Sequence, residues 1–371
     1  MLILTVLFYG YKGTRAYQFI QTEKQIGIVP TSTYCVSRYL EYGPLQTLSP
    51  FMEAFGYLNS IKKQTKITYP TYKLKNQIIE NIIVVLGESA QRNALQLYNS
   101  TIPTTPYAKQ REQQLYIYTQ AIAPSAYTNT AIALMLSNQV PTENFATLNF
   151  SNNIIHLAHN TQQWHTYWLS NQEQLSRFST FYTQQAEQAH SKQYTSNTYD
   201  EALLPLLQKV VKDNHKKRMI FMHLQGSHFN AKDRYPTSFD NFKQYPTYQN
   251  EYYNSIRYTD YLIEQVIQTV EHTPSVVIYI ADHGQDIINK QFVHAFTSKG
   301  LQVPFYIWSS STLDKSLYKT GINTTPISTT QLYNILTEYM GIEGLPLKDP
   351  NKELRVLNPQ LKVQTYETLK E

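Results

Sequence analysis

Residues 82–89 have the sequence Ile82-Ile83-Val84-Val85-Leu86-Gly87-Glu88-Ser89, an unbroken apolar run that ends in a carboxylate and a hydroxyl. A continuous Ile/Val/Leu run without polar alternation is typical of a strand buried on both faces of a parallel sheet. A second such run, Val276-Val277-Ile278-Tyr279-Ile280, leads into Ala281-Asp282-His283-Gly284. Ligands bind outside the carboxyl ends of the strands in such sheets. This arrangement allows the two polar ends to meet over one metal ion.

Strand and helix patterns alternate over residues 80–345. We expect further strands at 165–170, 219–223, 275–281 and 302–308, and helices at 89–97, 128–137, 200–212, 250–271 and 329–340. The alternation predicts an α/β fold with a mainly parallel central sheet and helices on both faces. We place an irregular N-terminal connector at 1–75, the folded domain at 76–348, and a loose polar tail at 349–371.

Composition narrows the classes of function and of metal site. Only 16% of the 371 residues are charged, and the net charge is +5 without a dense Lys/Arg stripe, which argues against nucleic-acid binding. The same charge is compatible with weak attraction to an anionic membrane surface. The single cysteine, Cys35, excludes an internal disulfide and a cysteine-based zinc site. Any metal must therefore bind to Asp, Glu, His and hydroxyl groups.

The first eleven residues, MLILTVLFYGY, are apolar and are followed by Lys12 and Arg15. They are too few to cross a bilayer, which needs about 20 residues. A signal peptide would carry its positive charge before the apolar stretch rather than after it. Two interpretations stay open: a buried or interfacial segment, or the end of a transmembrane helix, at 2–11, whose beginning the chain lacks.

Each candidate site residue has an ordinary structural alternative. Glu88 is either a metal ligand or a helix-start carboxylate favoured by the helix dipole. Asp282 and His283 either offer an oxygen and a nitrogen to one cation or form an N-cap with an incidental histidine. Thr128, like Ser125, is a possible cap of the predicted helix. Alternatively, its hydroxyl is suited to phosphate binding and nucleophilic attack.

Two more histidines have the same ambiguity. His228 follows the strand predicted at 219–223 and so falls on the same carboxyl edge, and His294 lies eleven positions after His283. Either one alone is equally explained as a loop or surface residue.

Taken together, the motifs resemble the phosphoethanolamine transferases of the sulfatase-like alkaline phosphatase superfamily, the lipopolysaccharide-modifying, polymyxin-resistance-related group of Gram-negative bacteria. The motifs come in the family's order and are found at 84–89, 97–98, 104–106, 125–131, 168–172, 223–228, 253–260, 282–284, 294 and 303–305. They cover roughly residues 80–345, so the resemblance makes 76–348 a sulfatase-like catalytic domain.

The resemblance also implies roles for individual residues. It implies one tight zinc site with the ligands Glu88, Thr128, Asp282 and His283. Thr128 is in addition the implied nucleophile, and Thr130 is the competing hydroxyl. His228 and His294 are implied to bind the substrate phosphate or a second zinc ion.

The implied reaction is transfer of phosphoethanolamine from phosphatidylethanolamine to a lipopolysaccharide acceptor, either a core sugar or lipid A, through a covalent phospho-threonine. It implies a monomer at the membrane surface, on the periplasmic face of the inner membrane, with no nucleic-acid partner. Alternatives are a phosphoglycerol transferase or phosphodiesterase of the same superfamily, or a non-catalytic glycan- or lipid-binding remnant without its anchor. The segment 229–232, Phe-Asn-Ala-Lys, departs from the Gly-Pro of the lipid A enzymes. Together with the lack of disulfides, it points towards relatives that modify core sugars or other glycans.

Overall fold

The computed structural model describes Tyr17 and residues 67–143, 145, 148–173, 180–195, 198–348 and 354–369. The apolar segment at 2–11 and nearly all of the expected connector lie outside these residues. Among the residues that are described, no helix combines the length and the apolar content needed to cross a membrane.

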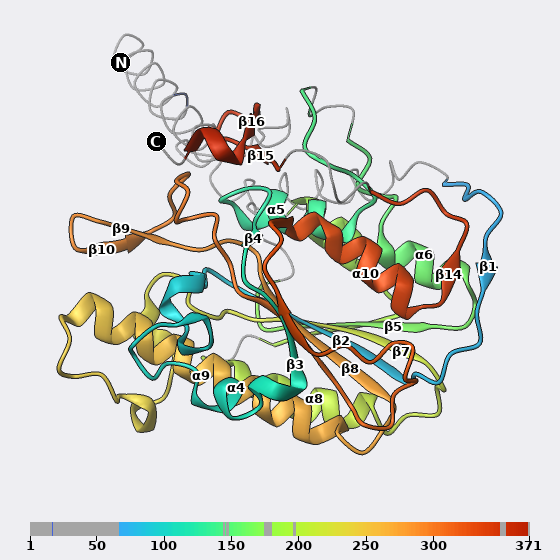
Figure 1. Ribbon diagram of the computed structural model, residues 1–371, viewed down its shortest axis with the longest axis horizontal. Coiled ribbons are helices and arrows are strands. Elements are labelled where there is room, and N and C mark those ends of the chain that lie inside the picture. Colours follow the sequence, from blue (N-terminus) through green and yellow to red (C-terminus); the bar gives the residue numbers. More distant parts are fainter. Residues whose placement is uncertain are drawn as a thin grey trace, which may run out of the picture.

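The apolar run at 82–86 forms the centre of an eight-stranded sheet whose order is β12-β3-β11-β8-β2-β7-β5-β6 (Figure 1). Strand β2 (Asn81–Gly87) is buried along its whole length. It pairs in parallel with β8 (Ser275–Ala281) and β7 (Arg218–His223). Beyond β7, the parallel arrangement continues through β5 (His165–Ser170) and β6 (Ser191–Tyr194).

The other side of the sheet is antiparallel in part. Strand β11 (Phe305–Ser309) runs antiparallel to both β8 and β3 (Leu115–Tyr118), and β12 (Gly321–Asn323) is parallel to β3. The sheet is therefore mixed, and the mainly parallel prediction describes it from β8 to β6. The sequence analysis missed β3, because its four residues, Leu-Tyr-Ile-Tyr, are too short for a periodicity to stand out.

Helices cover both faces of the sheet, which confirms the predicted α/β class (Figure 1). One layer contains α4 (Pro106–Gln110), α8 (Leu203–Val210) and α9 (Thr247–Val270). The other contains α5 (Thr128–Leu136), α6 (Ile154–Asn160) and α10 (Leu332–Tyr339), with α7 (Thr180–Ala186) packed against α5. All strands and helices expected from the sequence are present within a few residues, except the helix at 89–97.

Residues 89–97 form two short 3-10 turns, Arg92–Ala94 and Gln96–Tyr98, instead of an α-helix. Ser89 has a φ of 59°, outside the helical region. The Tyr252 hydroxyl donates to the Ser89 carbonyl at 2.7 Å and accepts from the Gln91 N–H at 2.8 Å. The first of these bonds occupies the Ser89 carbonyl, which would accept from the N–H four residues later in a helix.

The C-terminal segment is packed rather than loose, so that expectation is wrong for residues 354–369. Strand β15 (Arg355–Leu357) pairs antiparallel with β16 (Val363–Thr365). The Leu357 side chain is fully buried, and the Leu357 N–H donates to the Pro124 carbonyl at 2.8 Å. The buried side chains of Val356, Leu357 and Tyr366 anchor the segment.

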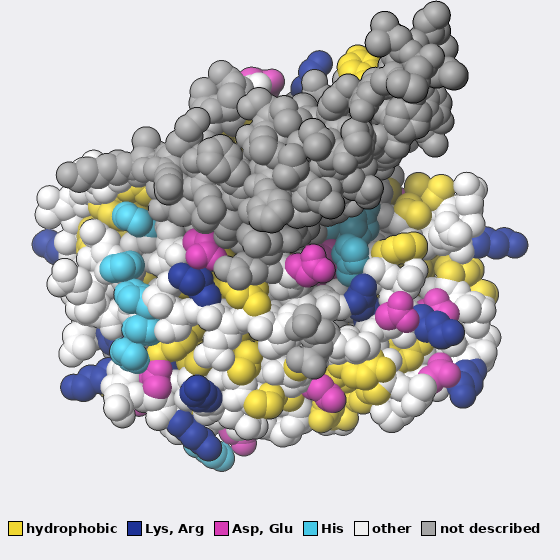
Figure 2. Space-filling model, turned by 180° about the vertical axis from the view of Figure 1, so that it is seen from behind, with side chains coloured by type: hydrophobic (Ala, Val, Ile, Leu, Met, Phe, Trp, Pro, Cys, Tyr) yellow, Lys and Arg dark blue, Asp and Glu magenta, His cyan; other side chains and the backbone are white. Residues whose placement is uncertain are grey.

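Four histidines at the amino-end side of β5 stack into a column, which consists of His159, His190, His165 and His215. Successive ring centroids are 4.3, 4.5 and 3.7 Å apart. Figure 2 shows a row of histidine side chains on one face of the molecule. Burial, together with His215 and His190, lowers the pKa of His165 to about 4.

This column predicts loss of stability in acid. The pKa of His165 is lower in the folded state than the ordinary value of 6.5, so protonation favours the unfolded chain. The stabilisation is complete above pH 6.5 and is lost as the pH falls towards 4. In urea titrations, His165→Asn should reduce the fall in unfolding free energy between pH 7 and pH 4. The exposed His272→Asn is the control, and equal slopes for both variants would refute the prediction.

Candidate metal and phosphoryl-transfer site

The candidate site lies where β2, β8 and β7 end. Gly87 is in register with Ala281, and the Asp282 N–H donates to the Gly87 carbonyl at 3.0 Å. The pairing brings Glu88, which follows β2, next to Asp282 and His283, which follow β8. The structure therefore brings the two polar strand ends together at one edge of the sheet.

Glu88, Asp282 and His283 form a buried group whose possible ligand atoms all lie within 4.8 Å of one another. His283 Nε2 is 3.4 Å from Glu88 Oε1 and 3.4 Å from Asp282 Oδ2. His283 Nδ1 lies 2.8 Å from the Gly284 carbonyl, which can only accept, so Nδ1 carries the proton. Nε2, the nitrogen left to bind a cation, consequently faces the two carboxylates, as in metal sites where a backbone carbonyl orients the ring of a histidine ligand.

Thr128, the first residue of α5, turns its hydroxyl into this group. Its Oγ1 donates to Glu88 Oε2 at 3.1 Å and lies 3.3 Å from His283 Nε2. The N-cap residue is Tyr127, which makes no side-chain cap bond, so Thr128 is not the cap of this helix. The competing Thr130 donates instead to Ser125 Oγ at 2.6 Å and is fully buried.

The C-terminal part of the chain holds both ends of α5. Leu357 bonds to Pro124, four residues before Thr128. At the other end, the buried Lys348 Nζ donates to the carbonyls of Leu134 at 3.1 Å and Thr330 at 2.7 Å. These contacts fix the helix that carries the Thr128 hydroxyl.

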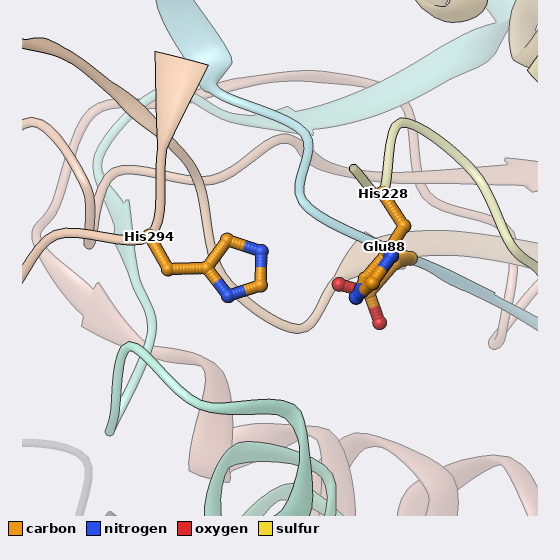
Figure 3. Close-up of side chains that lie close together, drawn as sticks. All are labelled: Glu88, His228 and His294. Carbon is orange, nitrogen blue, oxygen red and sulfur yellow. The ribbon is translucent and has the colours of Figure 1, made fainter. Parts of the chain in front are cut away.

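A second group shares Glu88 with the first and adds His228 and His294, again with all ligand atoms within 4.8 Å. The His228 and His294 rings lie 5.5 Å apart, and Figure 3 shows the His294 imidazole directed towards Glu88 and His228. Ser89 links the two groups, because its hydroxyl donates to Glu88 Oε1 at 2.6 Å and lies 3.0 Å from His294 Nε2. All six predicted site residues thus fall in one place.

The electrostatics of the buried group favour a cation. Burial and the charge of Glu88 raise the pKa of Asp282, whereas His283, His228 and His294 outweigh burial and lower the pKa of Glu88. Burial lowers the pKa of His283, but Asp282 and Glu88 raise it overall. Asp282 Oδ2 is buried without a hydrogen-bond partner. Two buried carboxylates, one of them with an orphaned oxygen, and a histidine lone pair together suit a divalent ion.

The sequence analysis did not assign three residues that support the site. Gln172 Nε2 donates to Glu88 Oε2 at 3.3 Å and to the Leu224 carbonyl at 2.7 Å. The buried Asp200 accepts from the N–H groups of Gln225 and Gly226, each at 2.9 Å, and so fixes the loop before His228. Gly226 is the third supporting residue, and the sequence pointed to it only through the motif at 223–228. No sequence motif pointed to Asp200.

Gly226 predicts a strong effect of a single methyl group. It has a φ of 53°, and a Cβ there would lie 2.8 Å from both the N and the O of Glu88. Gly226→Ala should lower the free energy of unfolding by about 3 kcal/mol and weaken metal binding, because Glu88 must move. Gly321→Ala, at φ 108° with nothing within 4 Å, tests backbone strain without a clash. A loss in Gly226→Ala no larger than the ~1–2 kcal/mol of a left-handed backbone alone, by urea unfolding, would show that the Glu88 contact is unimportant.

A mixed α/β sheet with carboxylates, histidines and a helix-start hydroxyl at the ends of its parallel strands defines the sulfatase and alkaline phosphatase class of enzymes. The chain belongs to the Sulfatase family, whose model matches residues 80–342.

Transferases are among its relatives. The chain is 30% identical over 315 residues to the Putative transferase YhbX of Escherichia coli K12. The matched region covers 82% of the chain and 57% of YhbX. It is 23% identical over 374 residues to the Phosphoethanolamine transferase EptC of Escherichia coli O18:K1:H7, covering 89% of the chain and 63% of EptC. The chain therefore spans less than two thirds of the length of these relatives.

Solved structures agree on the fold. The C-terminal periplasmic domain of EcEptC from Escherichia coli, in complex with Zn, has a TM-score of 0.70 at 20% identity, covering 82% of this chain and 98% of that domain. The soluble domain of lipooligosaccharide phosphoethanolamine transferase A from Neisseria meningitidis has a TM-score of 0.62 at 19% identity, covering 75% and 95%. These likenesses confirm the predicted fold, and the named relatives confirm the resemblance to phosphoethanolamine transferases.

Proposed function

We propose that the protein transfers phosphoethanolamine from phosphatidylethanolamine to a lipopolysaccharide acceptor through a covalent adduct on Thr128. The observation that carries the proposal is the Thr128 hydroxyl at the start of α5, 3.1 Å from Glu88 and 3.3 Å from His283. The names of the relatives support the transferred group, since several are phosphoethanolamine transferases.

We propose that Glu88, Thr128, Asp282 and His283 hold a zinc ion. The imidazole ligand favours zinc over magnesium or calcium, and the zinc complex of the EcEptC domain supports this choice. When bound, zinc would stabilise negative charge on the transferring phosphoryl group and lower the pKa of the nucleophile. His228 and His294 would hold a phosphate oxygen or a second zinc ion beside the shared Glu88.

In the first step, Thr128 Oγ1 attacks the phosphorus of the donor. A bond forms between this oxygen and phosphorus, the bond from phosphorus to the diacylglycerol oxygen breaks, and the proton of the threonine hydroxyl ends on that leaving oxygen. Glu88 and His283, the two groups within reach of the hydroxyl, orient it for the attack. The amino end of α5 favours the charge of the phosphate.

In the second step, a hydroxyl or phosphate oxygen of the acceptor attacks the same phosphorus. The bond between Thr128 Oγ1 and phosphorus breaks, and the acceptor's proton returns to the threonine. The segment at 229–232 supports a core sugar or another glycan as acceptor rather than lipid A. We place the reaction at the periplasmic face of the inner membrane and propose a monomer.

Mass spectrometry of the full chain after incubation with phosphatidylethanolamine vesicles tests the proposal. The expected result is a phosphoethanolamine adduct on the peptide that contains Thr128. A phosphoglycerol adduct, formed only with phosphatidylglycerol, would support a phosphoglycerol transferase instead. Absence of an adduct, of bound metal and of phosphodiester hydrolysis would favour the non-catalytic glycan- or lipid-binding remnant.

A further inference from the structure

A free-standing hairpin connects the two parts of the site. Strands β9 (Asp286–Ile288) and β10 (Gln291–Val293) form a two-stranded antiparallel sheet of their own. The hairpin begins three residues after His283 and ends directly before His294. Figure 1 shows it projecting from the body of the molecule. Its base is therefore fixed at the site, and its tip extends away from it.

The hairpin is held firmly. Phe292 stacks on Tyr252 of α9 with ring centroids 3.9 Å apart, and the Tyr252 hydroxyl donates to the Ser89 carbonyl in the site. At the turn, Asn289 and Lys290 have φ values of 51° and 59°. Positive φ at both central residues is typical of the tight turn that matches strand twist. The tip is therefore a tight two-residue turn between paired strands.

The tip presents apolar side chains to water on both of its faces. Ile287 is 41% exposed and Ile288 is 45% exposed. The register pairs Ile287 with Phe292 and Ile288 with Gln291, so the two isoleucines point to opposite sides. Lys290 at the turn is exposed, and no acidic residue lies between Ile287 and Val293. The tip thus combines apolar surface with a positive charge.

Phe229 is a third exposed apolar group next to the site. It follows His228, whose ring lies 5.5 Å from that of His294. The Phe229 carbonyl accepts from Arg234 Nη2 at 2.9 Å and lies 2.9 Å from His228 Nδ1, yet the side chain is 72% exposed. The backbone is held in place while the ring remains in water.

We propose that Phe229, Ile287 and Ile288, together with the charged Lys290, form a lip that inserts into the lipid bilayer carrying the donor. The inference rests on the proposed function, because the phosphate of a phospholipid lies at the bilayer surface and the site must touch that surface to reach it. Apolar side chains beside a lysine bind at the boundary between headgroups and acyl chains, where anionic lipids attract the cation. A narrow hairpin that is apolar on both faces suits a fluid lipid layer better than a flat protein surface.

A fluorescent probe tests insertion independently of turnover. The chain's three tryptophans, Trp164, Trp168 and Trp308, are at most 3% exposed, so they provide a constant background. Ile288→Trp in the full chain should shift its emission to the blue and be quenched by vesicles of phosphatidylethanolamine and phosphatidylglycerol with brominated acyl chains. Ile78→Trp is the matched control, because Ile78 is 65% exposed and precedes the amino end of β2, opposite the site. Equal quenching of the two indoles, or none at position 288, would overturn the proposal.

A second experiment asks what the lip does for the reaction. The double variant Ile287→Ser/Ile288→Ser should form the Thr128 adduct at least ~10-fold more slowly with vesicle donor, since two apolar anchors are lost. Its rate with a short-chain, water-soluble phosphatidylethanolamine should be unchanged. Equal losses with both donors would contradict the lip, because the hairpin would then support the site itself. Quenching at position 288 without any Thr128 adduct would refute the proposed function but support membrane insertion of the lip. An adduct without quenching would support the proposed function and refute insertion.

Discussion

Thr128→Ala is expected to slow transfer of phosphoethanolamine at least ~10³-fold, because loss of a nucleophile removes the covalent route altogether. The described site offers no good substitute. Thr130 donates to Ser125 Oγ at 2.6 Å and is fully buried, and Ser89 is already bonded to Glu88. The measurement is release of labelled diacylglycerol from phosphatidylethanolamine, combined with mass spectrometry of the protein.

Two variants make the result specific to Thr128. Thr128→Ser keeps a hydroxyl and should retain part of the activity and the adduct. Thr130→Ala should still form the adduct on Thr128. If Thr130→Ala forms no adduct while Thr128→Ala remains active, Thr130 is the nucleophile instead. Zinc content must be measured for each protein, because Thr128 is also a proposed ligand. Transfer that survives in zinc-loaded Thr128→Ala would refute the assignment.

Glu88→Gln is expected to weaken zinc binding at least ~100-fold, because loss of a group that merely orients a ligand already costs about 10–100-fold, and Glu88 is a proposed ligand itself. Glu88 belongs to both candidate metal groups, so its loss affects both. The amide is neutral and offers only one oxygen, while Ser89, Gln172 and Thr128 all donate to the native carboxylate. Competition with a chelator and metal analysis by mass spectrometry measure the change.

Glu80→Gln is the matched control for this variant, because the exposed Glu80 precedes β2 at the end opposite Glu88. It should bind zinc like the natural protein. The metal-free form of Glu88→Gln should be less stable than the metal-free natural protein, because the histidines that lower the pKa of Glu88 stabilise its charged form in the folded state. If Glu88→Gln still binds zinc with native affinity, the proposed ligand set is wrong.

The sequence predicted the centre of the fold because burial on both faces leaves a continuous apolar run. That signal identifies β2 and β8 directly, and the meeting of parallel strand ends then brings Glu88 close to Asp282 and His283. It does not identify β3, which is short. The apolar pattern also does not reveal that residues 89–97 form 3-10 turns rather than an α-helix. The Tyr252 hydroxyl that bonds to this backbone comes from α9, which is distant in the sequence.

The supporting residues of the site were hidden for the same reason. Asp200 and Gln172 act through backbone groups and side chains of other loops, and their local sequence contains no trace of those partners. The conformation of Gly226 depends on how closely its loop approaches Glu88. Such contacts are set by tertiary packing, which a single sequence does not encode as a periodic pattern.

The packing of the C-terminal segment shows that the region matched by the family model is smaller than the structural unit that supports the site. The Sulfatase match ends at residue 342, but Lys348 and Leu357 lie beyond it and hold the two ends of the Thr128 helix. A chimera that exchanges only the matched region with a relative would carry all six candidate site residues, yet the helix that begins at Thr128 would rest on a foreign C-terminal segment. Exchanges between such enzymes should therefore cross over after this segment rather than at the family boundary.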